Sequence, residues 1–279
     1  MPKKEHLEKL QVEAHRLIGK NWSNASLTRE KLLGNIDRIC EFVAEKGMQH
    51  IKHIDGSFVT EFFERQQEKG LVPSTIAGYG TAMRAIASGI GKQNIVPREN
   101  ANLGGSRKGT RLNPSTPDVP KMLEVREKLY QKAEWLGIAS DIRTVFGVRP
   151  KESLMSKTTF TDKVGRTLYE IEGAKTGRPR NLTVDSVEKA AVVAQIREYM
   201  VKTGHKSIMP SSLTLKQACK FQSNTLNRIG ATKANNANAY QWRHAYAQAL
   251  DIAGVNRALI ASDLGHGRIE VLSHYIHRK

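Results

Sequence analysis

The sequence predicts a mainly α-helical protein with one small antiparallel β-sheet and two domains. Three observations lead to this fold class: amphipathic helical segments fill residues 1–100, apolar periodicity lapses over 101–119, and helices resume over 120–279 around a single β-hairpin. A chain of 279 residues is long enough to bury two hydrophobic cores of ordinary size. We therefore expect a helical domain, a linker and a second domain over these three ranges.

The first domain is predicted from three segments whose apolar residues recur at helical spacing. Asp55 is placed to cap the second of these helices, because its carboxylate can accept from the free backbone N–H groups of the first turn. A helical domain of this kind needs an inward-facing apolar stripe on each helix. The residues expected in these stripes are Leu32, Ile36, Val43, Phe58, Phe62, Phe63, Ile76, Tyr79, Met83 and Ile86.

The linker and the hairpin are both marked by glycine and proline. The stretch ANLGGSRKGTRLNPSTPDVP carries Arg107, Lys108 and Arg111, which suit a crossing of a duplex backbone as well as they suit a solvated loop. Farther on, β-rich runs at 167–171 and 182–184 flank a glycine-containing turn. This arrangement predicts an antiparallel hairpin.

The charge balance favours a polyanionic partner. The chain has 44 Lys and Arg against 27 Asp and Glu, a net charge of +17 spread along its length. It has no helix that joins a basic face to exposed Trp or Phe, which favours nucleic acid over a membrane surface. Without an apolar run of membrane-spanning length, and with a first segment too charged for a signal peptide, the protein is expected to stay where it is made.

The cysteines and the acidic residues indicate neither a metal site nor a cofactor. Cys40 and Cys219 lie within apolar helical patterns, with no Cys or His at ligand spacing, which predicts buried thiols in a reducing compartment. The sequence has no acidic metal cluster and no GxxxxGK[ST] phosphate loop. We therefore expect chemistry without metal, ATP or another cofactor.

Candidate chemistry begins in the stretch FGVRPKESL. Gly147 is suited to end one helix and Pro150 to begin the next, which leaves Arg149 at the junction. A guanidinium beside the free N–H groups of a helix start makes an anion site. The alternative is an exposed arginine paired with Glu152.

Further candidates lie in NAYQWRHAYAQALDIAG and at the end of the chain. The core stripe expected on the first of these helices is Trp242, Tyr246, Ala249 and Ala253. Tyr240 and Arg243 then share another face, and His244 is expected in the core. In LGHGRIEVLSHYIHRK, His266 stands between two glycines, and Tyr275 lies one position off an apolar stripe.

That stripe consists of Ile269, Leu272 and Ile276, whose spacing predicts a packed terminal helix that carries Tyr275 at its edge. Lys175 belongs to the hairpin turn, where a lysine is ordinarily solvated. Each feature has an ordinary structural explanation when taken alone. The order in which they occur along the chain is not accounted for by these separate structural explanations.

The order of GVRPKE, a hairpin lysine in AKTGRPR, YQWRHAYA and LGHGRIEVLSHY resembles that of the tyrosine recombinase (phage integrase) family. His266 and Tyr275 are nine positions apart (275 − 266), which is the family's usual spacing. The N-terminal helices resemble the family's SAM-like core-binding domain, so the likeness spans roughly residues 20–279. It implies a core-binding domain that contacts DNA, followed by a tyrosine recombinase catalytic domain.

The resemblance implies a site-specific DNA recombinase or integrase that works through a 3′-phosphotyrosyl intermediate. Tyr275 would attack phosphorus, and Lys175 would protonate the leaving 5′ oxygen. Arg149 and Arg243 would clamp the non-bridging oxygens of the scissile phosphate, and His266 would donate a hydrogen bond to it. Fixed cations neutralise the charge that builds up during attack, and a phenol with a pKa of about 10 leaves readily in the reverse step.

Of two further positions in the family pattern, one matches here and the other differs. Glu152 matches the supporting acidic position and would orient the arginines. Tyr240 stands where the family's His-x-x-Arg motif most often has histidine, and a phenol donates a hydrogen bond but accepts a proton poorly at neutral pH. The family's general base therefore has no assigned counterpart here.

The resemblance also implies double-stranded DNA as partner, a homotetramer on two DNA sites with a monomer in free solution, no membrane, and a cytoplasmic, nucleoid-associated protein of a prokaryotic mobile genetic element. Two alternatives stay open. The chain could be a catalytically inactive DNA-binding regulator on the same fold, a reading that Tyr240 supports. It could also be a type IB topoisomerase-like enzyme, with the same chemistry and little choice of site.

Overall fold

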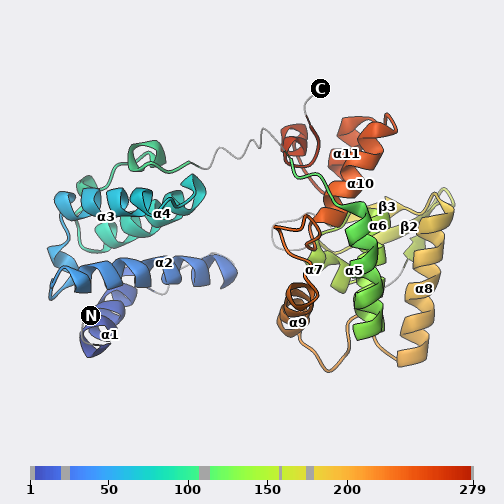
Figure 1. Cartoon of the computed structure of the whole chain (residues 1–279), viewed down its shortest axis with the longest axis horizontal. Coiled ribbons are helices and arrows are strands. Elements are labelled where there is room, and N and C mark those ends of the chain that lie inside the picture. Colours follow the sequence, from blue (N-terminus) through green and yellow to red (C-terminus); the bar gives the residue numbers. More distant parts are fainter. Residues whose placement is uncertain (1–3, 20–25, 107–113, 157–158, 174–178, 278–279) are drawn as a thin grey trace. The chain divides into compact units, whose positions relative to one another are not determined.

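The computed structural model describes residues 4–19, 26–106, 114–156, 159–173 and 179–277. The chain forms two compact units, Met1–Gly109 and Thr110–Lys279, which are described one at a time (Figure 1). Most of the described residues are helical, and one small antiparallel sheet interrupts the helices of the second unit. The predicted fold class is confirmed. None of the helices in the described part of the chain is both long and apolar enough to span a membrane.

The first unit consists of helices around one apolar core. Its elements are α1 (Lys4–Ile18), α2 (Ser26–Glu45), η1 (Ile51–His53), α3 (Gly56–Glu68), α4 (Pro73–Gly89), η2 (Gln93–Ile95) and η3 (Asn100–Leu103), where η marks a 3-10 helix. All ten apolar residues predicted to face inward are buried. The carboxylate of Asp55 accepts a hydrogen bond from the backbone N–H of Phe58 at 2.9 Å, so the predicted cap of α3 is confirmed.

Part of the segment expected to be a linker is folded onto one unit or the other. Leu103 is buried in the first core, and the backbone N–H of Ser106 donates to the carbonyl of Pro73 at 3.0 Å. On the other side, the backbone N–H of Asp118 donates to Asn236 in the second unit. The basic positions of the segment, Arg107, Lys108 and Arg111, lie outside the described residues.

The second unit is built around α6. Its elements are α5 (Val119–Lys132), α6 (Glu134–Phe146), α7 (Pro150–Leu154), β1 (Thr159–Thr161), β2 (Thr167–Ile171), β3 (Arg180–Thr183), α8 (Val187–Thr203), α9 (Leu215–Arg228), α10 (Gln241–Ile252), α11 (Arg257–Asp263) and η4 (Ile269–His274). Helix α6 packs against α5, α8 and α10 and is buried on nearly all sides. It is therefore the element on which the surrounding helices are arranged.

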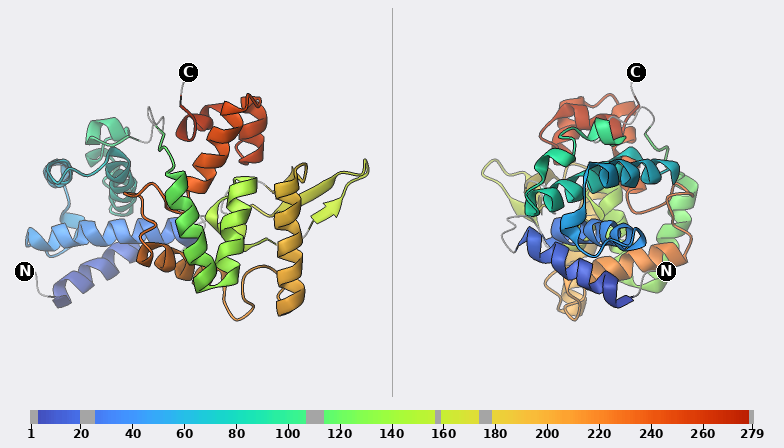
Figure 2. Two further views of the ribbon diagram at one scale, coloured as in Figure 1. Left: turned by 45° about the vertical axis from the view of Figure 1, so that its right-hand side comes forward. Right: turned by 90° about the vertical axis from the view of Figure 1, so that its left-hand side faces the viewer.

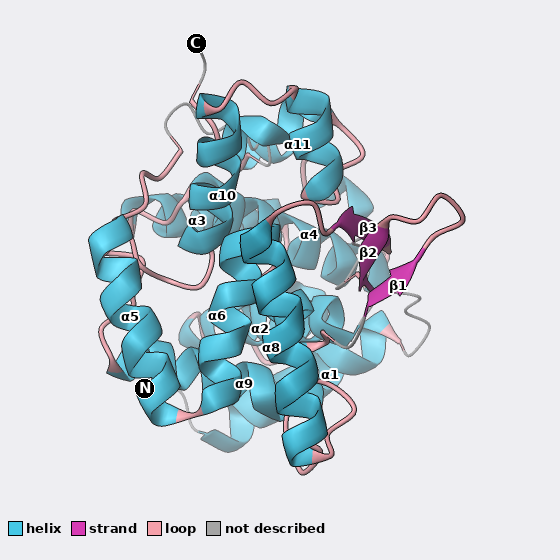
Figure 3. Ribbon diagram, turned by 90° about the vertical axis from the view of Figure 1, so that its right-hand side faces the viewer, coloured by secondary structure: helices cyan, strands magenta, loops and turns pink. Residues whose placement is uncertain are grey.

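The sheet has the order β1-β2-β3 and lies at the α8 side of the unit, away from α5 (Figure 3). Strands β2 and β3 form the predicted hairpin, with Tyr169 opposite Leu182. Tyr169 is fully buried, and its ring stacks on Phe146 of α6 with 4.5 Å between the centroids. This contact docks the sheet on the helical core. Strand β1 was not predicted, because three residues are too few for a period-2 pattern to register.

The predicted terminal helix is wrong in type. The segment forms the short 3-10 helix η4, and Tyr275 follows it directly. Leu272 and Ile276 are buried as expected, but Ile269 is 47% exposed. A 3-10 helix turns more tightly than an α-helix and is usually short, so the segment offers no continuous apolar stripe. In Figure 2 it lies beside α10 and α11 at one end of the unit.

The predicted core face of α10 is also partly wrong. Trp242 and Tyr246 are buried, whereas Ala249 and Ala253 are exposed. The buried face instead includes Arg243, whose side chain has no exposed surface. Periodicity alone assigns a charged residue to the solvent side of a helix, and only the acceptors supplied by other elements make this burial tolerable.

Gly147→Ala should lower the free energy of unfolding of the second unit by about 2–4 kcal/mol. Gly147 has a φ of +59°, and an added methyl group would overlap the Tyr246 ring. Gly204→Ala is the matched control, because Gly204 has a φ of +68° with no atom within 4 Å of the added carbon, so it carries only the backbone cost of about 1 kcal/mol. Urea unfolding followed by circular dichroism measures both losses, and equal losses would contradict this account.

Candidate active site

The candidate residues gather where four parts of the second unit meet: the α6–α7 junction, the start of β3, the first turn of α10, and the segment from α11 through η4. Arg149 is the N-cap residue of α7, and its side chain is 22% exposed. Its backbone N–H donates to Oε2 of Glu152 at 2.8 Å, and its Nη1 donates to Oε1 at 2.8 Å. Arg149 therefore pairs with Glu152, as the alternative given in the sequence analysis predicts. Its side chain, however, is largely enclosed rather than exposed.

Glu152 is an anion enclosed between two arginines. Its side chain has no exposed surface, and Arg180 reaches its Oε1 from Nη1 at 3.4 Å and its Oε2 from Nη2 at 3.1 Å. Burial on its own raises the pKa of Glu152, but the hydrogen bonds and charges of Arg180 and Arg149 outweigh it and bring the pKa to about 2. Glu152 is therefore ionised at neutral pH and fixes the direction of both guanidinium groups.

Arg243 has no exposed surface, and its guanidinium is hydrogen-bonded on every nitrogen. Nη1 donates to the carbonyl of Gly147 at 2.8 Å, and Nη2 donates to the carbonyl of Leu264. Nε donates to the hydroxyl of Tyr275 at 3.2 Å. Burial lowers the pKa of Arg243 from its ordinary value. These contacts join α10 to the α6–α7 junction and to the terminal segment around one cation.

His266 is bound to the same guanidinium. Its Nε2 lies 3.0 Å from Nη2 of Arg243, which places the hydrogen-bond acceptor on Nε2, since a guanidinium only donates. Burial first, and then the charges of Arg243 and Arg149, lower the pKa of His266 to about 3. The ring is therefore neutral at pH 7, with its proton on Nδ1.

Tyr275 lies within this cluster with its side chain partly exposed. Its ring centroid is 5.5 Å from that of His266 and 4.9 Å from that of His244. Its backbone carbonyl accepts from Gln248 of α10 at 2.9 Å, which ties the segment after η4 to that helix. His244 is buried, in line with the core position expected for it.

Tyr240 and Tyr275 both line a pocket of about 450 Å³. Its side chain is 53% exposed, so it does not share the buried position of Arg243, although the two residues are three apart on the chain. The pocket is lined by Ser115, Lys233, Asn238, Tyr240, Gln241, His244, His274 and Tyr275. Tyr240 and Tyr275 thus open onto one pocket, which is large enough for a phosphate group.

The structure brings together Arg149, Glu152, Arg243, His266 and Tyr275, and Tyr240 shares a pocket with Tyr275 of this cluster. Lys175 lies outside the described residues. Sequence reasoning missed Arg180, although it belongs to the quoted stretch AKTGRPR. The available signal was a cluster of basic residues at the hairpin, and nothing in the pattern separated Arg180 from its neighbours.

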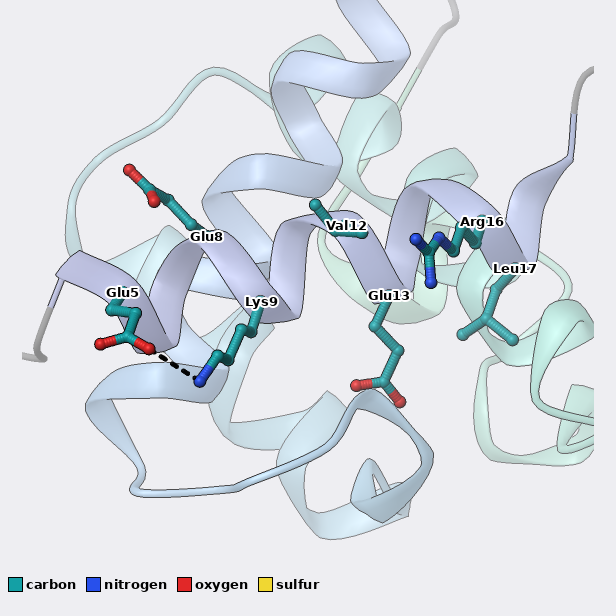
Figure 4. A pocket seen from close by; sticks show the side chains of 7 residues that line it. All are labelled: Glu5, Glu8, Lys9, Val12, Glu13, Arg16 and Leu17. Atoms are coloured by element: carbon teal, nitrogen blue, oxygen red, sulfur yellow. Dashed lines mark ion pairs between the residues drawn. The ribbon is translucent and has the colours of Figure 1, made fainter.

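The pocket along α1 has fewer side chains suited to catalysis. The one drawn in Figure 4 is about 680 Å³ and lies along α1, with Glu5 and Lys9 joined by an ion pair at 2.9 Å. Its lining residues, all from α1, include neither a nucleophile nor a second cluster of cations. In the described part of the chain, no three His, Cys, Asp or Glu side chains are grouped so as to hold a metal ion.

Comparisons with known proteins address the fold. No family model matches this sequence, and no curated protein matches it. The XerH site-specific recombinase bound to difH substrate, in a pre-cleavage complex, matches with a TM-score of 0.64 and 18% identity, over 96% of this chain and 81% of that chain. A lambda integrase dimer bound to a COC′ core site matches with a TM-score of 0.63 and 12% identity, over 98% and 77% of the two chains.

The Tn1549 transposon integrase in complex with transposon right end DNA also matches, with a TM-score of 0.55 and 14% identity, over 97% of this chain and 95% of that chain. At such identities the likeness concerns the fold. The chain has the tyrosine recombinase fold, as the sequence resemblance implied, and these structural neighbours are recombinases and integrases bound to DNA.

His266→Gln should change how stability depends on pH. Since the pKa of His266 is lowered to about 3 in the folded protein from 6.5, only the unfolded chain gains a proton there as the pH falls below 6.5. The wild type should therefore lose stability relative to His266→Gln between pH 6.5 and pH 4. Thermal unfolding across this range measures the difference, and a gap that stays constant with pH would contradict the assigned protonation state.

Proposed function

We propose that this chain is a site-specific DNA recombinase that cleaves and rejoins DNA through a 3′-phosphotyrosyl intermediate. The observation that carries the proposal is the buried guanidinium of Arg243, which binds the hydroxyl of Tyr275 and the ring of His266 together, with the Arg149–Glu152 pair beside it. A nucleophile held against fixed cations is the arrangement that attack on a phosphodiester needs, because the phosphate oxygens repel an incoming nucleophile.

The proposed reaction has two balanced steps. In the first step, the hydroxyl of Tyr275 loses its proton to solvent water as its oxygen attacks phosphorus, the bond to the 5′ oxygen breaks, and protonated Lys175 supplies the proton that makes this oxygen a hydroxyl. In the second step, the 5′ hydroxyl of another strand gives its proton to the neutral amine of Lys175 as it attacks the phosphotyrosine, and the phenolate of Tyr275 leaves and regains a proton from water. The number of phosphodiester bonds is unchanged, so no ATP is consumed.

The proposed clamp requires a rearrangement when DNA binds. The Nε of Arg243 donates to Tyr275, and its Nη2 is shared with His266. A phosphate oxygen that enters the site would take over these donors and release the hydroxyl of Tyr275 for attack. His266 would then turn its proton toward the phosphate, and the negative charge of the phosphate would favour that proton. Glu152 would keep Arg149 directed at the other non-bridging oxygen.

The partner in this proposal is double-stranded DNA, which suits the net charge of +17. The first unit would act as the core-binding domain and the second as the catalytic domain, joined by the basic segment. The lambda integrase structures include a dimer on a core site and a tetramer on a Holliday junction, which supports a homotetramer on two DNA sites as the working assembly. We place the protein in the prokaryotic cytoplasm, at the nucleoid, as part of a mobile genetic element.

Covalent capture tests the proposed reaction. The tagged protein is incubated with sheared genomic DNA, denatured in detergent and purified, and the attached fragments are sequenced. A nicked duplex of the enriched sequence, which releases a short fragment on cleavage, then serves as suicide substrate. We expect a covalent adduct with the wild type and none with Tyr275→Phe, which removes only the attacking oxygen.

Two other outcomes would identify the alternative functions. Equal, non-covalent DNA binding by the wild type and Tyr275→Phe would favour a catalytically inactive regulator. Relaxation of arbitrary supercoiled plasmid, with no recombinant products, would favour a topoisomerase-like enzyme. Either result would overturn the proposed recombinase.

Tyr240→Phe should slow adduct formation by about 10- to 100-fold, because a hydrogen bond to a charged group contributes roughly 1.5–3 kcal/mol. Tyr240 faces the pocket of Tyr275 and, in this proposal, donates its hydroxyl to a phosphate oxygen. Tyr240→His is the matched variant and should retain activity, because imidazole restores a donor. Single-turnover cleavage of the suicide substrate gives the three rates. An unchanged rate in Tyr240→Phe would exclude the phenol as a donor.

A further inference from the structure

Arg180 connects three elements of the active site and has no role in the reaction as proposed above. It is the first residue of β3, and its side chain is only 9% exposed. Nη1 and Nη2 reach the two carboxylate oxygens of Glu152, and Nε donates to the backbone carbonyl of Asp263 at 2.6 Å. One side chain thus joins the hairpin to α7 and to the last residue of α11.

The contact with Glu152 determines where Arg149 points. Oε1 of Glu152 receives Nη1 from both arginines, and Oε2 receives the backbone N–H of Arg149 together with Nη2 of Arg180. A carboxylate held from two sides has little freedom to rotate, and Arg149 is bound to it by two hydrogen bonds. Without Arg180, Glu152 would lose one side of this support while staying buried.

The contact with Asp263 fixes the turn that carries His266. The carbonyl of the next residue, Leu264, accepts from Arg243, and the backbone N–H of His266 donates to Ala261 at 2.8 Å. The Asp263 carboxylate accepts from the hydroxyl of Tyr246 at 3.1 Å, so its backbone and side chain are both held. A shift of Asp263 would therefore move His266 relative to the guanidinium to which it is bonded.

We propose that Arg180 is a positioning residue of the active site, which holds Arg149 through Glu152 and the His266 turn through Asp263. It touches no reacting atom in the proposed reaction. Its position in the sequence is compatible with the same role, because it follows Lys175 by five residues. This inference rests on the proposed recombinase function.

Single-turnover cleavage of the suicide substrate by Arg180→Met, Arg180→Lys and Arg257→Met tests the proposal. Arg257 is the matched control, because it also makes two contacts to one carboxylate, that of Asp251, at 2.7 and 3.1 Å. We expect Arg180→Met to slow adduct formation on the order of 100-fold, with DNA affinity changed less than about threefold, because misplaced groups affect the transition state more than binding. Arg180→Lys should recover part of the rate, and Arg257→Met should cleave at nearly the wild-type rate.

A second measurement separates positioning from general damage to the fold. Glu152 is faced by Arg149 and Arg180, with the charge of Arg243 nearby. In the wild type, the contribution of ionised Glu152 to the free energy of unfolding is lost only as the pH falls from 4.5 toward 2. In Arg180→Met the pKa of Glu152 should rise, so the stability gap between the two proteins should narrow as the pH falls toward 2.

The outcomes are distinct. Wild-type cleavage by Arg180→Met, or a loss no larger than in Arg257→Met, would overturn the positioning role. If the wild type forms no adduct at all, the proposed function fails, and the pH dependence of stability still decides whether Arg180 holds Glu152. A stability gap that does not change with pH would then overturn the inference as well.

Discussion

The complete burial of the Arg243 guanidinium is the constraint on which the rest of the second unit depends. A buried cation is costly unless each of its donors is hydrogen-bonded, and here the acceptors come from Gly147, Leu264, His266 and Tyr275. Gly147 is far along the chain from the other three. The α6–α7 junction, α10 and the terminal segment must therefore converge on one point if the unit is to fold, and this convergence also assembles the candidate site.

A second arginine, Arg143, is buried between α6 and α10 in a different environment. Arg143 of α6 has no exposed surface, and its guanidinium lies over the Trp242 ring with 5.0 Å to the centroid. Among the described residues none hydrogen-bonds to its guanidinium nitrogens, and burial lowers its pKa to about 9. On α10, the ring of Trp242 packs against Arg143 of α6, and the adjacent Arg243 donates to the carbonyl of Gly147 at the end of α6. The two helices are therefore held together both by a cation–π contact and by a hydrogen bond.

The elements that the sequence predicted well are those whose local pattern and tertiary role agree. The stripes of α2, α3 and α4 repeat at helical spacing and all face one core, and Asp55 caps α3 through a contact three residues away. Two of the features that the sequence did not predict correctly are short segments. Strand β1 has three residues and the 3-10 helix η4 has six, so periodicity had too few residues to register them.

The sequence by itself determined the types of the candidate residues, their order and the presence of two units, because these follow from composition, motif spacing and repeated apolar patterns. Only the tertiary structure decided that Arg243 is buried, that His266 accepts from it, and that Arg180 braces Glu152. The reason is that each of these contacts joins residues separated by more than twenty positions. No local spacing encodes such a contact, and it exists only once the packing of α6, α10 and the hairpin has brought its partners together.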